Sequence, residues 1–308
     1  MNQAALTSPR VSVIIPHFNM PDALDRCLAS VRAQGNVGEA EIIVVDNGST
    51  ITPDAVVARH AGVRLLVEPT AGPGPARNTG VAAARADILV FIDADCRADS
   101  GWLAAAVAAV AAGGKRGLAG GDVRIDFVDA AHLTPIEAYE AVFAYRQKMY
   151  IERQGFSGTG NLAMHRDVFE TVGPFAGIGV AEDRDWGHRA RCAGYRFVYV
   201  PAMRIFHPAR PDYDSLRIKW QRHIAHDWAA HQASGQRHWR WWLKAVAMPF
   251  SVMVDAVRLL LSDRLAGVSN KVRGIAILAR LRSFRGREMR RVLARGSADA
   301  GRHWQATG

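Results

Sequence analysis

The first two hundred residues of the chain alternate between two patterns of hydrophobic and polar positions. Short apolar runs, rich in β-branched residues and bounded by turn residues, predict strands at 11–15, 41–46, 63–67 and 88–92. Apolar residues at helical spacing predict helices at 21–34, 76–85, 102–112 and 182–194. Such alternation is typical of a parallel sheet with crossover helices, so the sequence predicts an α/β domain.

Two later segments also have strand character. An alternating stretch at 120–128 predicts a strand that leaves the core, and 197–200 predicts a short strand that ends at Pro201. We find no internal repeat in the chain.

The C-terminal third has a different pattern. Residues 245–261 form the most apolar stretch, but Pro249, Asp255 and Arg258 interrupt it, so no window reaches the roughly 20 apolar residues of a spanning helix. Tryptophans and arginines border this stretch, as in a helix that lies in the headgroup region of a membrane. Packing of the same face on the rest of the protein is the alternative, and the sequence leaves both open.

The charge is divided unevenly along the chain. Residues 1–214 carry 21 Lys and Arg against 24 Asp and Glu, whereas 215–308 carry 18 against 5, so the net charge of +10 comes from the last third. A basic segment suits an anionic membrane surface or a nucleic acid. No nucleic-acid-binding motif accompanies the charge, so we expect no nucleic-acid partner and predict membrane-surface contact through 215–308 as one option.

The N-terminus and the cysteines indicate the compartment. Residues 1–9 are small and polar, and the first predicted strand follows directly, which leaves no room for a signal peptide. We therefore expect a cytoplasmic protein, with peripheral contact on the inner face of the cell membrane as an option. Cys27, Cys96 and Cys192 lack the spacing of a disulfide framework or a zinc site, so we interpret them as reduced thiols.

Acidic residues follow two of the predicted strands. Asp46 ends the second strand, and Asp93 and Asp95 follow the buried run at 88–92. The carboxyl ends of parallel strands face the ligand crevice of an α/β sheet, and two carboxylates there can hold Mg²⁺ or Mn²⁺ beside a diphosphate. The alternative is a solvated acidic turn without a ligand.

Five motifs in order carry a resemblance to a known family. They lie at 11–19, 45–50, 74–80 and 91–95, followed by Gly194-Tyr195 at the end of the helix that Glu182-Asp183 begins. With this pattern over about 10–210, the chain resembles the inverting family 2 glycosyltransferases of the GT-A fold. The resemblance implies one Rossmann-like, mostly parallel sheet flanked by helices in a catalytic domain at 1–214. Its nucleotide-sugar half would span about 10–96 and its acceptor half about 97–214, with 215–308 as a basic, partly amphipathic helical extension.

The resemblance also implies roles for individual residues. Asp95 would bind the metal together with Asp93 and His207, although a lone histidine such as His207 is more often structural. Asp46 would accept a hydrogen bond from the base, and Arg77 and Asn78 would meet the phosphates at a helix start. The full predicted nucleotide-sugar site comprises Pro16, Phe18, Asn19, Asp46, Asn47, Ser49, Arg77, Asn78, Asp93 and Ala94.

The implied catalytic group is a carboxylate. Inversion needs one base to take the proton of the acceptor hydroxyl, and we assign it to Asp183, with Glu182 as the flanking acid. An acidic first helical turn without chemistry is the alternative. The predicted acceptor and sugar site comprises Gly158, Thr159, Gly160, Asn161 and Trp186.

The predicted activity is metal-dependent inverting transfer of one sugar, with Mn²⁺ or Mg²⁺ as cofactor. The donor would be linked to UDP, dTDP or GDP, and His17 and Asn47 depart from the family pattern and leave the nucleotide open. The acceptor would be a glycan or a lipid-linked molecule of cell-envelope or exopolysaccharide assembly. Residues 221–224 lack the Gln-x-x-Arg-Trp signature of processive synthases, which favours a single transfer.

Two alternatives belong to other classes. A sugar nucleotidyltransferase would need a glycine-rich basic loop after the first strand, and 16–22 offers none. A non-catalytic membrane or nucleic-acid binding module on a transferase scaffold would use the basic C-terminal third alone.

Overall fold

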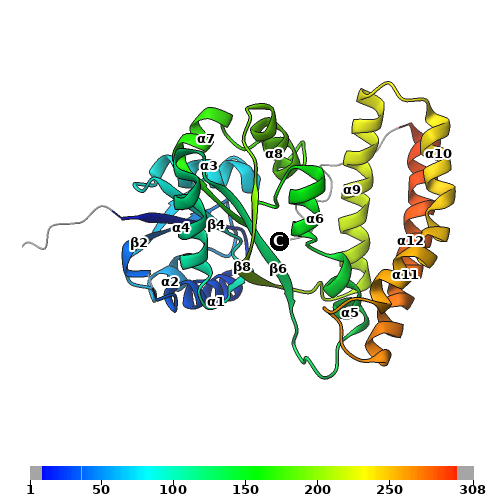
Figure 1. Ribbon diagram of the computed structural model, residues 1–308, viewed down its shortest axis with the longest axis horizontal. Helices are drawn as coiled ribbons and strands as arrows, with labels where there is room; N and C mark the ends of the chain where they lie inside the picture. The colour runs from blue at the N-terminus through cyan, green and yellow to red at the C-terminus, as the bar shows by residue number, and fades with distance from the viewer. Residues whose placement is uncertain (1–8, 36, 297–308) are drawn as a thin grey trace, which may run out of the picture. The chain divides into compact units, whose positions relative to one another are not determined.

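The computed structural model describes residues 9–35 and 37–296, which divide into two compact units (Figure 1). The first unit contains 9–124 and 145–207, and the second contains 125–144 and 208–296. The predicted division at residue 214 follows chain order, whereas the observed units follow contacts. The segment 125–144 is therefore grouped with the C-terminal third.

The described residues form an eight-stranded mixed sheet in the order β3-β2-β1-β4-β7-β6-β8-β5. The first strands pair in parallel, β1 with β2 and β4, and β2 with β3. The pairs β4–β7, β6–β7 and β5–β8 are antiparallel. The α/β class is confirmed, and the parallel pairs given above join the first four strands. The strands are β1 (Val11–His17), β2 (Ala40–Asp46), β3 (Val63–Val67), β4 (Ile88–Ile92), β5 (Arg97–Ala98), β6 (Leu118–Asp126), β7 (Asn161–His165) and β8 (Val198–Pro208).

Helices cover both faces of this sheet (Figure 1). One face packs on α1 (Pro21–Arg32), α2 (Asp54–Val57) and α4 (Trp102–Gly113). The other face packs on α3 (Pro73–Ala83), α7 (Arg166–Val172) and α8 (Glu182–Cys192). Burial on both faces explains why the central strands are continuous apolar runs. Short elements connect these layers: η1 (Val37–Glu39), η2 (Gly114–Arg116), α6 (Gln147–Met149) and η3 (Tyr150–Gln154).

The structure corrects the predicted end of the last strand. We expected Pro201 to end it, but β8 continues to Pro208. Its neighbour β5 pairs only with Ile205 and Phe206, so Pro201 does not face a β5 residue that would need its missing N–H. The longer β8 carries His207 back to the edge of the sheet where β4 ends.

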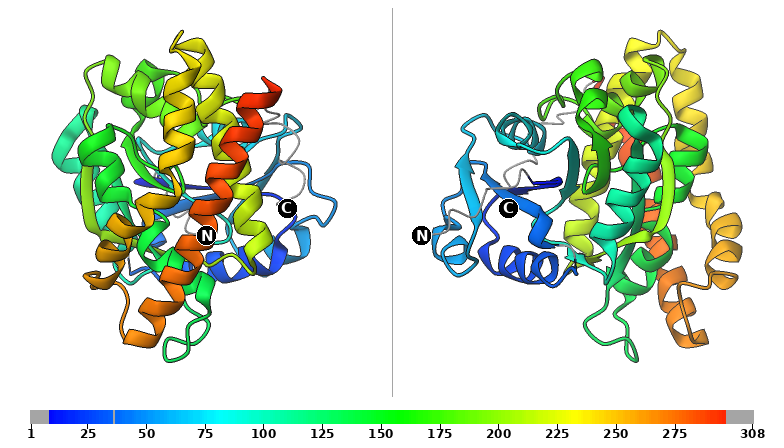
Figure 2. Two further views of the ribbon diagram at one scale, coloured as in Figure 1. Left: turned by 90° about the vertical axis from the view of Figure 1, so that its right-hand side faces the viewer. Right: turned by 60° about the vertical axis from the view of Figure 1, so that its left-hand side comes forward.

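The second unit is helical and is arranged around one long helix, α12 (Val268–Arg295). Its other elements are α5 (Pro135–Phe143), α9 (Tyr213–Ala233), α10 (His238–Ala247), η4 (Pro249–Ser251) and α11 (Val252–Leu260). Figure 2 shows α10 and α11 lying along α12. A side chain at Gly274 would approach Leu259 to 2.8 Å, and one at Gly286 would approach the Ala245 carbonyl to 2.8 Å. These two glycines allow α11 and α10 to lie close to α12.

Among the residues described, no helix is both long enough and apolar enough to cross a membrane.

Candidate active site

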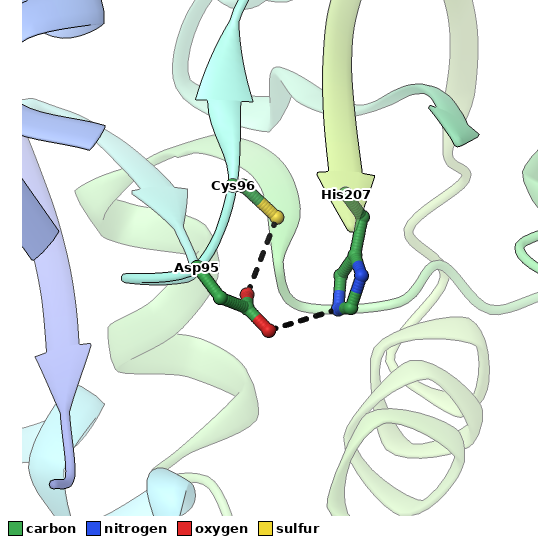
Figure 3. Close-up of side chains that lie close together, drawn as sticks. All are labelled: Asp95, Cys96 and His207. Atoms are coloured by element: carbon green, nitrogen blue, oxygen red, sulfur yellow. Dashed lines mark hydrogen bonds and ion pairs between the residues drawn. The ribbon is translucent and has the colours of Figure 1, made fainter. Parts of the chain in front are cut away.

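The sheet register brings Asp95 and His207 together. Asp95 lies just before β5, and β5 pairs antiparallel with the end of β8, Arg97 opposite Phe206. His207 is the next residue of β8, and its Nε2 lies 3.1 Å from Asp95 Oδ2 (Figure 3). Two residues 112 positions apart in the chain thus form one ion pair because β8 returns beside β5.

Tyr145 is a member of this site that the sequence analysis missed. Its hydroxyl lies 2.8 Å from His207 Nε2, and the two ring centroids are 4.5 Å apart. Tyr145 has φ of 48°, an uncommon left-handed conformation for a tyrosine. No residue pattern around position 145 signals this conformation, so only the folded chain reveals the contact.

The Asp95 and His207 donor atoms suit a hard divalent cation. Neighbouring ligands of an octahedral ion with bonds of 2.0–2.1 Å are separated by roughly 3 Å, close to the distance between this oxygen and nitrogen. Burial acts to raise the pKa of Asp95, but the charge and hydrogen bond of His207 act against it, and the pKa lies below its ordinary value. Asp95 is therefore ionised at neutral pH, as a metal ligand must be.

Cys96 lies beside this pair but has different chemistry. Its Sγ is 3.6 Å from Asp95 Oδ1, and the three side chains form a cluster with metal-ligand spacing (Figure 3). Burial, with the negative charges of Asp95 and Asp93, raises the pKa of the Cys96 thiol well above its ordinary value. A neutral thiol is a poor ligand for Mg²⁺ or Mn²⁺, so the fit to a hard ion rests on Asp95 and His207.

Arg77 connects two acidic residues that are 89 positions apart in the chain. Its Nη2 donates to Asp93 Oδ1 at 2.7 Å, and its Nη1 donates to Glu182 Oε1 at 3.4 Å. The side chain is buried, and its Nε has no partner among the residues that the structure covers. Any side chain at Gly160 would collide with the Asp93 carboxylate, so the glycine keeps Asp93 in this position. The predicted contact of Arg77 with phosphate stays a prediction.

Asp183 lies in the first turn of α8, next to Glu182. Burial, helped by the negative charge of Glu182, raises the pKa of Asp183 from 3.8 to about 6. The backbone N–H of Arg184 donates to Asp183 Oδ1 at 2.7 Å and opposes part of this shift. A carboxylate with a pKa near 6 is ionised at neutral pH yet binds a proton more strongly than an exposed aspartate, which suits a general base.

Asp46 is held by three protein groups. Its Oδ1 accepts from His17 Nδ1 at 2.9 Å and from Ser49 Oγ at 2.5 Å, and its Oδ2 accepts from the Ser49 N–H at 3.1 Å. Asn19, with φ of 54°, accepts hydrogen bonds from the backbone N–H groups of Thr50 and Ile51. The predicted nucleotide loop is thus preorganised, and its contact with a base stays a prediction.

The side-chain amides of Asn47 and Asn78, both predicted to lie in the donor site, form hydrogen bonds within the protein. Asn47 Nδ2 donates to the carbonyls of Glu68 and Thr70, and Asn78 exchanges two hydrogen bonds of 2.9 Å with the Phe175 backbone. Both side chains position loops, and a phosphate would meet the surrounding backbone more readily than the Asn78 amide. Of the remaining predicted donor residues, Pro16 and Phe18 are half-buried and Ala94 is buried.

Asn161 and Trp186, predicted to contact sugar, lie in the interior. Asn161 is fully buried, accepts from Trp102 Nε1 at 2.9 Å and donates to the carbonyls of Asp122 and Met203. Trp186 is 1% exposed and donates to the Gly173 carbonyl. Both therefore have packing roles here, and a direct sugar contact would require them to leave the core. Gly158 and Thr159 precede β7, close to the Asp93 end of β4.

Known proteins resemble this chain in sequence. The model of the family described as Glycosyl transferase family 2 matches residues 12–173. Glycosyltransferase AglE of Haloferax volcanii is 32% identical over 222 residues, which cover 70% of this chain and 72% of that protein. The Pre-mycofactocin glycosyltransferase of Mycobacterium tuberculosis is 38% identical over 96 residues, which cover 30% of this chain and 19% of that protein.

Solved structures resemble the fold. The mannosyltransferase PcManGT from Pyrobaculum calidifontis, in complex with GDP-Man and Mn²⁺, matches with a TM-score of 0.61 and 20% identity, covering 94% of this chain and 88% of that one. GalNAc-T7 with UDP, GalNAc and Mn²⁺ matches with a TM-score of 0.51 and 19% identity, covering 67% of this chain and 45% of that one. The predicted GT-A fold is confirmed by these neighbours.

Proposed function

Because the chain belongs to glycosyl transferase family 2 and is a glycosyltransferase, we propose that it transfers one sugar with inversion from a nucleotide-sugar to an acceptor hydroxyl. The observation that carries this proposal is the polar series from Asp95 and His207, through Asp93, Arg77 and Glu182, to Asp183. One end of this series supplies ligands for a cation, and the other end supplies a carboxylate with a raised pKa. Inverting transfer needs both, the cation for the diphosphate and the carboxylate as the base.

Asp95 and His207 would hold the divalent ion, Mn²⁺ or Mg²⁺. Structural neighbours contain Mn²⁺ together with a nucleotide-sugar or its parts, which supports a divalent metal here. When bound, the ion would offset the negative charge that develops on the leaving nucleoside diphosphate. Tyr145 would position the His207 ring through the contact between the two rings, and its hydroxyl would release Nε2 when that nitrogen binds the ion.

Asp183 would act as the base. It would accept the proton of the acceptor hydroxyl while that oxygen forms a bond to the anomeric carbon and the bond from this carbon to the diphosphate breaks. Arg77 would keep Glu182 and Asp93 in fixed positions beside the base. The loop around Asp46 and Ser49 would bind the nucleotide of a UDP-, dTDP- or GDP-linked donor.

The acceptor in this proposal is a glycan or a lipid-linked molecule of cell-envelope or exopolysaccharide assembly, modified on the cytoplasmic side. The basic C-terminal third supports an anionic, membrane-associated setting. The missing processive signature at 221–224 supports one transfer per acceptor.

Replacing Asp183 by Asn tests the proposal. We expect Asp183→Asn to lower kcat by roughly 10³-fold, the range for loss of a general base, with nucleotide-diphosphate binding in Mn²⁺ within about threefold of wild type. The control is Asp185→Asn, which removes a carboxylate from the same helical turn where it pairs with Arg189 at 2.9 Å. Turnover of radiolabelled or mass-tagged acceptor would measure both, and full activity in Asp183→Asn would refute the base assignment.

The pH profile gives a second readout on Asp183. The folded-state pKa of about 6 exceeds the ordinary 3.8, so kcat should rise through pH about 6 as Asp183 ionises. The same shift lowers the free energy of unfolding as pH rises from 3.8 to about 6, because over that range the unfolded chain releases the Asp183 proton before the folded chain does. Asp183→Asn should therefore be at least as stable as wild type at pH 8, which separates lost catalysis from lost folding.

A further inference from the structure

The second unit carries a continuous row of exposed apolar side chains along α10, η4 and α11. Its members recur at separations of three, four and seven residues, which places them on one helical side even across the irregular turn at Pro249. Their exposed fractions lie between 47% and 80%. We call this row the outer stripe, and its members are Trp239, Trp242, Leu243, Phe250, Met253, Val254, Val257, Leu260 and Leu261.

The opposite side of the same helices supplies the packing. Trp241, Ala245 and Leu259 are buried, and Trp241 Nε1 donates to the Met289 carbonyl of α12 at 2.9 Å. These contacts, with the close approach at Gly286, fix α10 and α11 along α12 (Figure 2). The unit therefore has its own core without the outer stripe, and the stripe is available for another partner.

The start of α12 extends the apolar surface. Val268 and Val272 are 77% and 59% exposed. Between them in sequence, Lys271 Nζ donates to the Leu260 carbonyl at 2.5 Å, which joins this turn of α12 to the end of α11. Exposed apolar side chains that follow one another along a helical side are typical of an interaction site.

The charges around the stripe indicate the class of partner. Residues 237–273 contain seven Lys and Arg against two Asp. One of these acids, Asp255, is already paired with Arg258 and Arg282. The two exposed tryptophans lie at one end of the stripe, and the Arg240 guanidinium lies 5.8 Å from the Trp239 ring centroid.

This combination matches one occupant better than others. A second copy of the chain would bring an equally cationic segment against the first, and nucleic acid would leave the apolar centre uncovered. An anionic bilayer suits both the basic residues and the apolar stripe. Its phosphates attract the cations, while tryptophan and aliphatic side chains enter the headgroup boundary. No helix of the described residues can span the bilayer, so the contact lies on its surface.

We propose that the outer stripe is a membrane-docking face that binds the surface of bilayers containing anionic phospholipids. Docking requires neither donor nor metal, so it is independent of the proposed glycosyl transfer and can fail or succeed separately.

Vesicle flotation of the full chain tests the proposal. We expect binding to vesicles of 70% phosphatidylcholine and 30% phosphatidylglycerol, at least tenfold weaker binding to phosphatidylcholine alone, and weakening as salt rises from 50 to 500 mM. Phe250→Ser/Met253→Ser/Leu261→Ser should reduce partitioning at least tenfold, because it removes three of the most exposed stripe residues.

The matched control changes three exposed valines outside the stripe, Val67→Ser/Val128→Ser/Val198→Ser. This control should bind vesicles like wild type, and both triple variants should keep the wild-type thermal midpoint. Lipids brominated near the headgroup should quench wild-type tryptophan fluorescence, and Trp239→Phe/Trp242→Phe should remove that quenching.

Three results would overturn the proposal. The first is wild-type protein that stays with the unbound fraction at 50 mM salt. The second is equal loss of vesicle binding in the two triple variants. The third is a wild-type dimer in light scattering that the stripe variant dissociates, since that result assigns the face to a second copy.

Discussion

Of the aspartate-histidine pairs in the sheet domain, two that lie at strand ends have different surroundings. His17 and Asp46 are 2.9 Å apart with the histidine side chain fully buried, whereas His207 and Asp95 are 3.1 Å apart and both partly exposed. In the first pair, Nδ1 faces the carboxylate and Nε2 accepts from the Met20 N–H. In the second, Nε2 faces both Asp95 and the Tyr145 hydroxyl.

The difference separates a structural pair, His17 and Asp46, from the pair that we propose as cation ligands, His207 and Asp95. Every polar atom of the His17 ring has a protein partner, and Ser49 supplies two further hydrogen bonds to Asp46. That pair stabilises the loop after β2, because breaking it would leave buried polar groups unsatisfied. The Asp95 pair is partly exposed and has donor atoms at the spacing of a metal shell, which is why we propose it as the cation site.

The largest expected effect, on metal-dependent binding and catalysis, comes from changing Asp95 in the proposed cation site. Asp95→Asn keeps the side-chain shape but removes the anionic ligand, so we expect Mn²⁺-dependent nucleotide binding and kcat/KM to fall by at least about 100-fold. Calorimetric titration of Mn²⁺ with a nucleoside diphosphate measures the binding. Unaltered Mn²⁺ affinity would remove Asp95 from the metal site.

A smaller effect, on stability, is expected at the structural pair. His17→Phe leaves the Met20 N–H and part of the Asp46 carboxylate without partners, and we expect a loss of about 2–3 kcal/mol in the free energy of unfolding. The matched control is His207→Phe, which should change stability by less than about 1 kcal/mol because its surroundings are partly solvated. Urea unfolding of both variants makes the comparison, and equal losses would erase the distinction between the pairs.

The smallest effect is expected at Tyr145. Tyr145→Phe keeps the ring contact with His207 and removes only the hydroxyl that occupies Nε2, so we expect Mn²⁺ affinity to change by about tenfold or less with an unchanged thermal midpoint. A loss as large as that of Asp95→Asn would make the tyrosine a direct ligand instead of a positioning residue. Activity measured across Mn²⁺ concentrations distinguishes these cases, because a positioning defect is partly recovered at high metal.

Local sequence was sufficient for the four parallel strands, whereas β5 and β7 were not predicted. The β-branched runs around Ile14, Ile43 and Val90 predicted buried strands because a strand covered on both faces must be apolar throughout. The same reasoning placed Asp46, Asp93 and Asp95 at strand ends. It was wrong at Pro201, where the effect of a proline depends on which neighbouring strand faces it.

The same reasoning predicted less about the packing of the helical unit. The apolar residues at 245–261 predicted an amphipathic segment, and the charge count predicted a basic surface. Which side packs on α12 depends on glycines elsewhere in the chain, at 274 and 286. The grouping of 125–144 with the C-terminal residues likewise rests on contacts between distant segments.

The sequence by itself determined the strand pattern, the family motifs and the acidic residues at the strand ends, because each depends on neighbouring residues or on chain order. Only the tertiary structure decided which of these groups meet. The return of β8 beside β5 pairs His207 with Asp95, a buried arginine joins Asp93 to Glu182, and burial raises the pKa of Asp183. Distances between remote residues and their exposure to water belong to the folded chain, and these two quantities control ligand geometry and proton affinity.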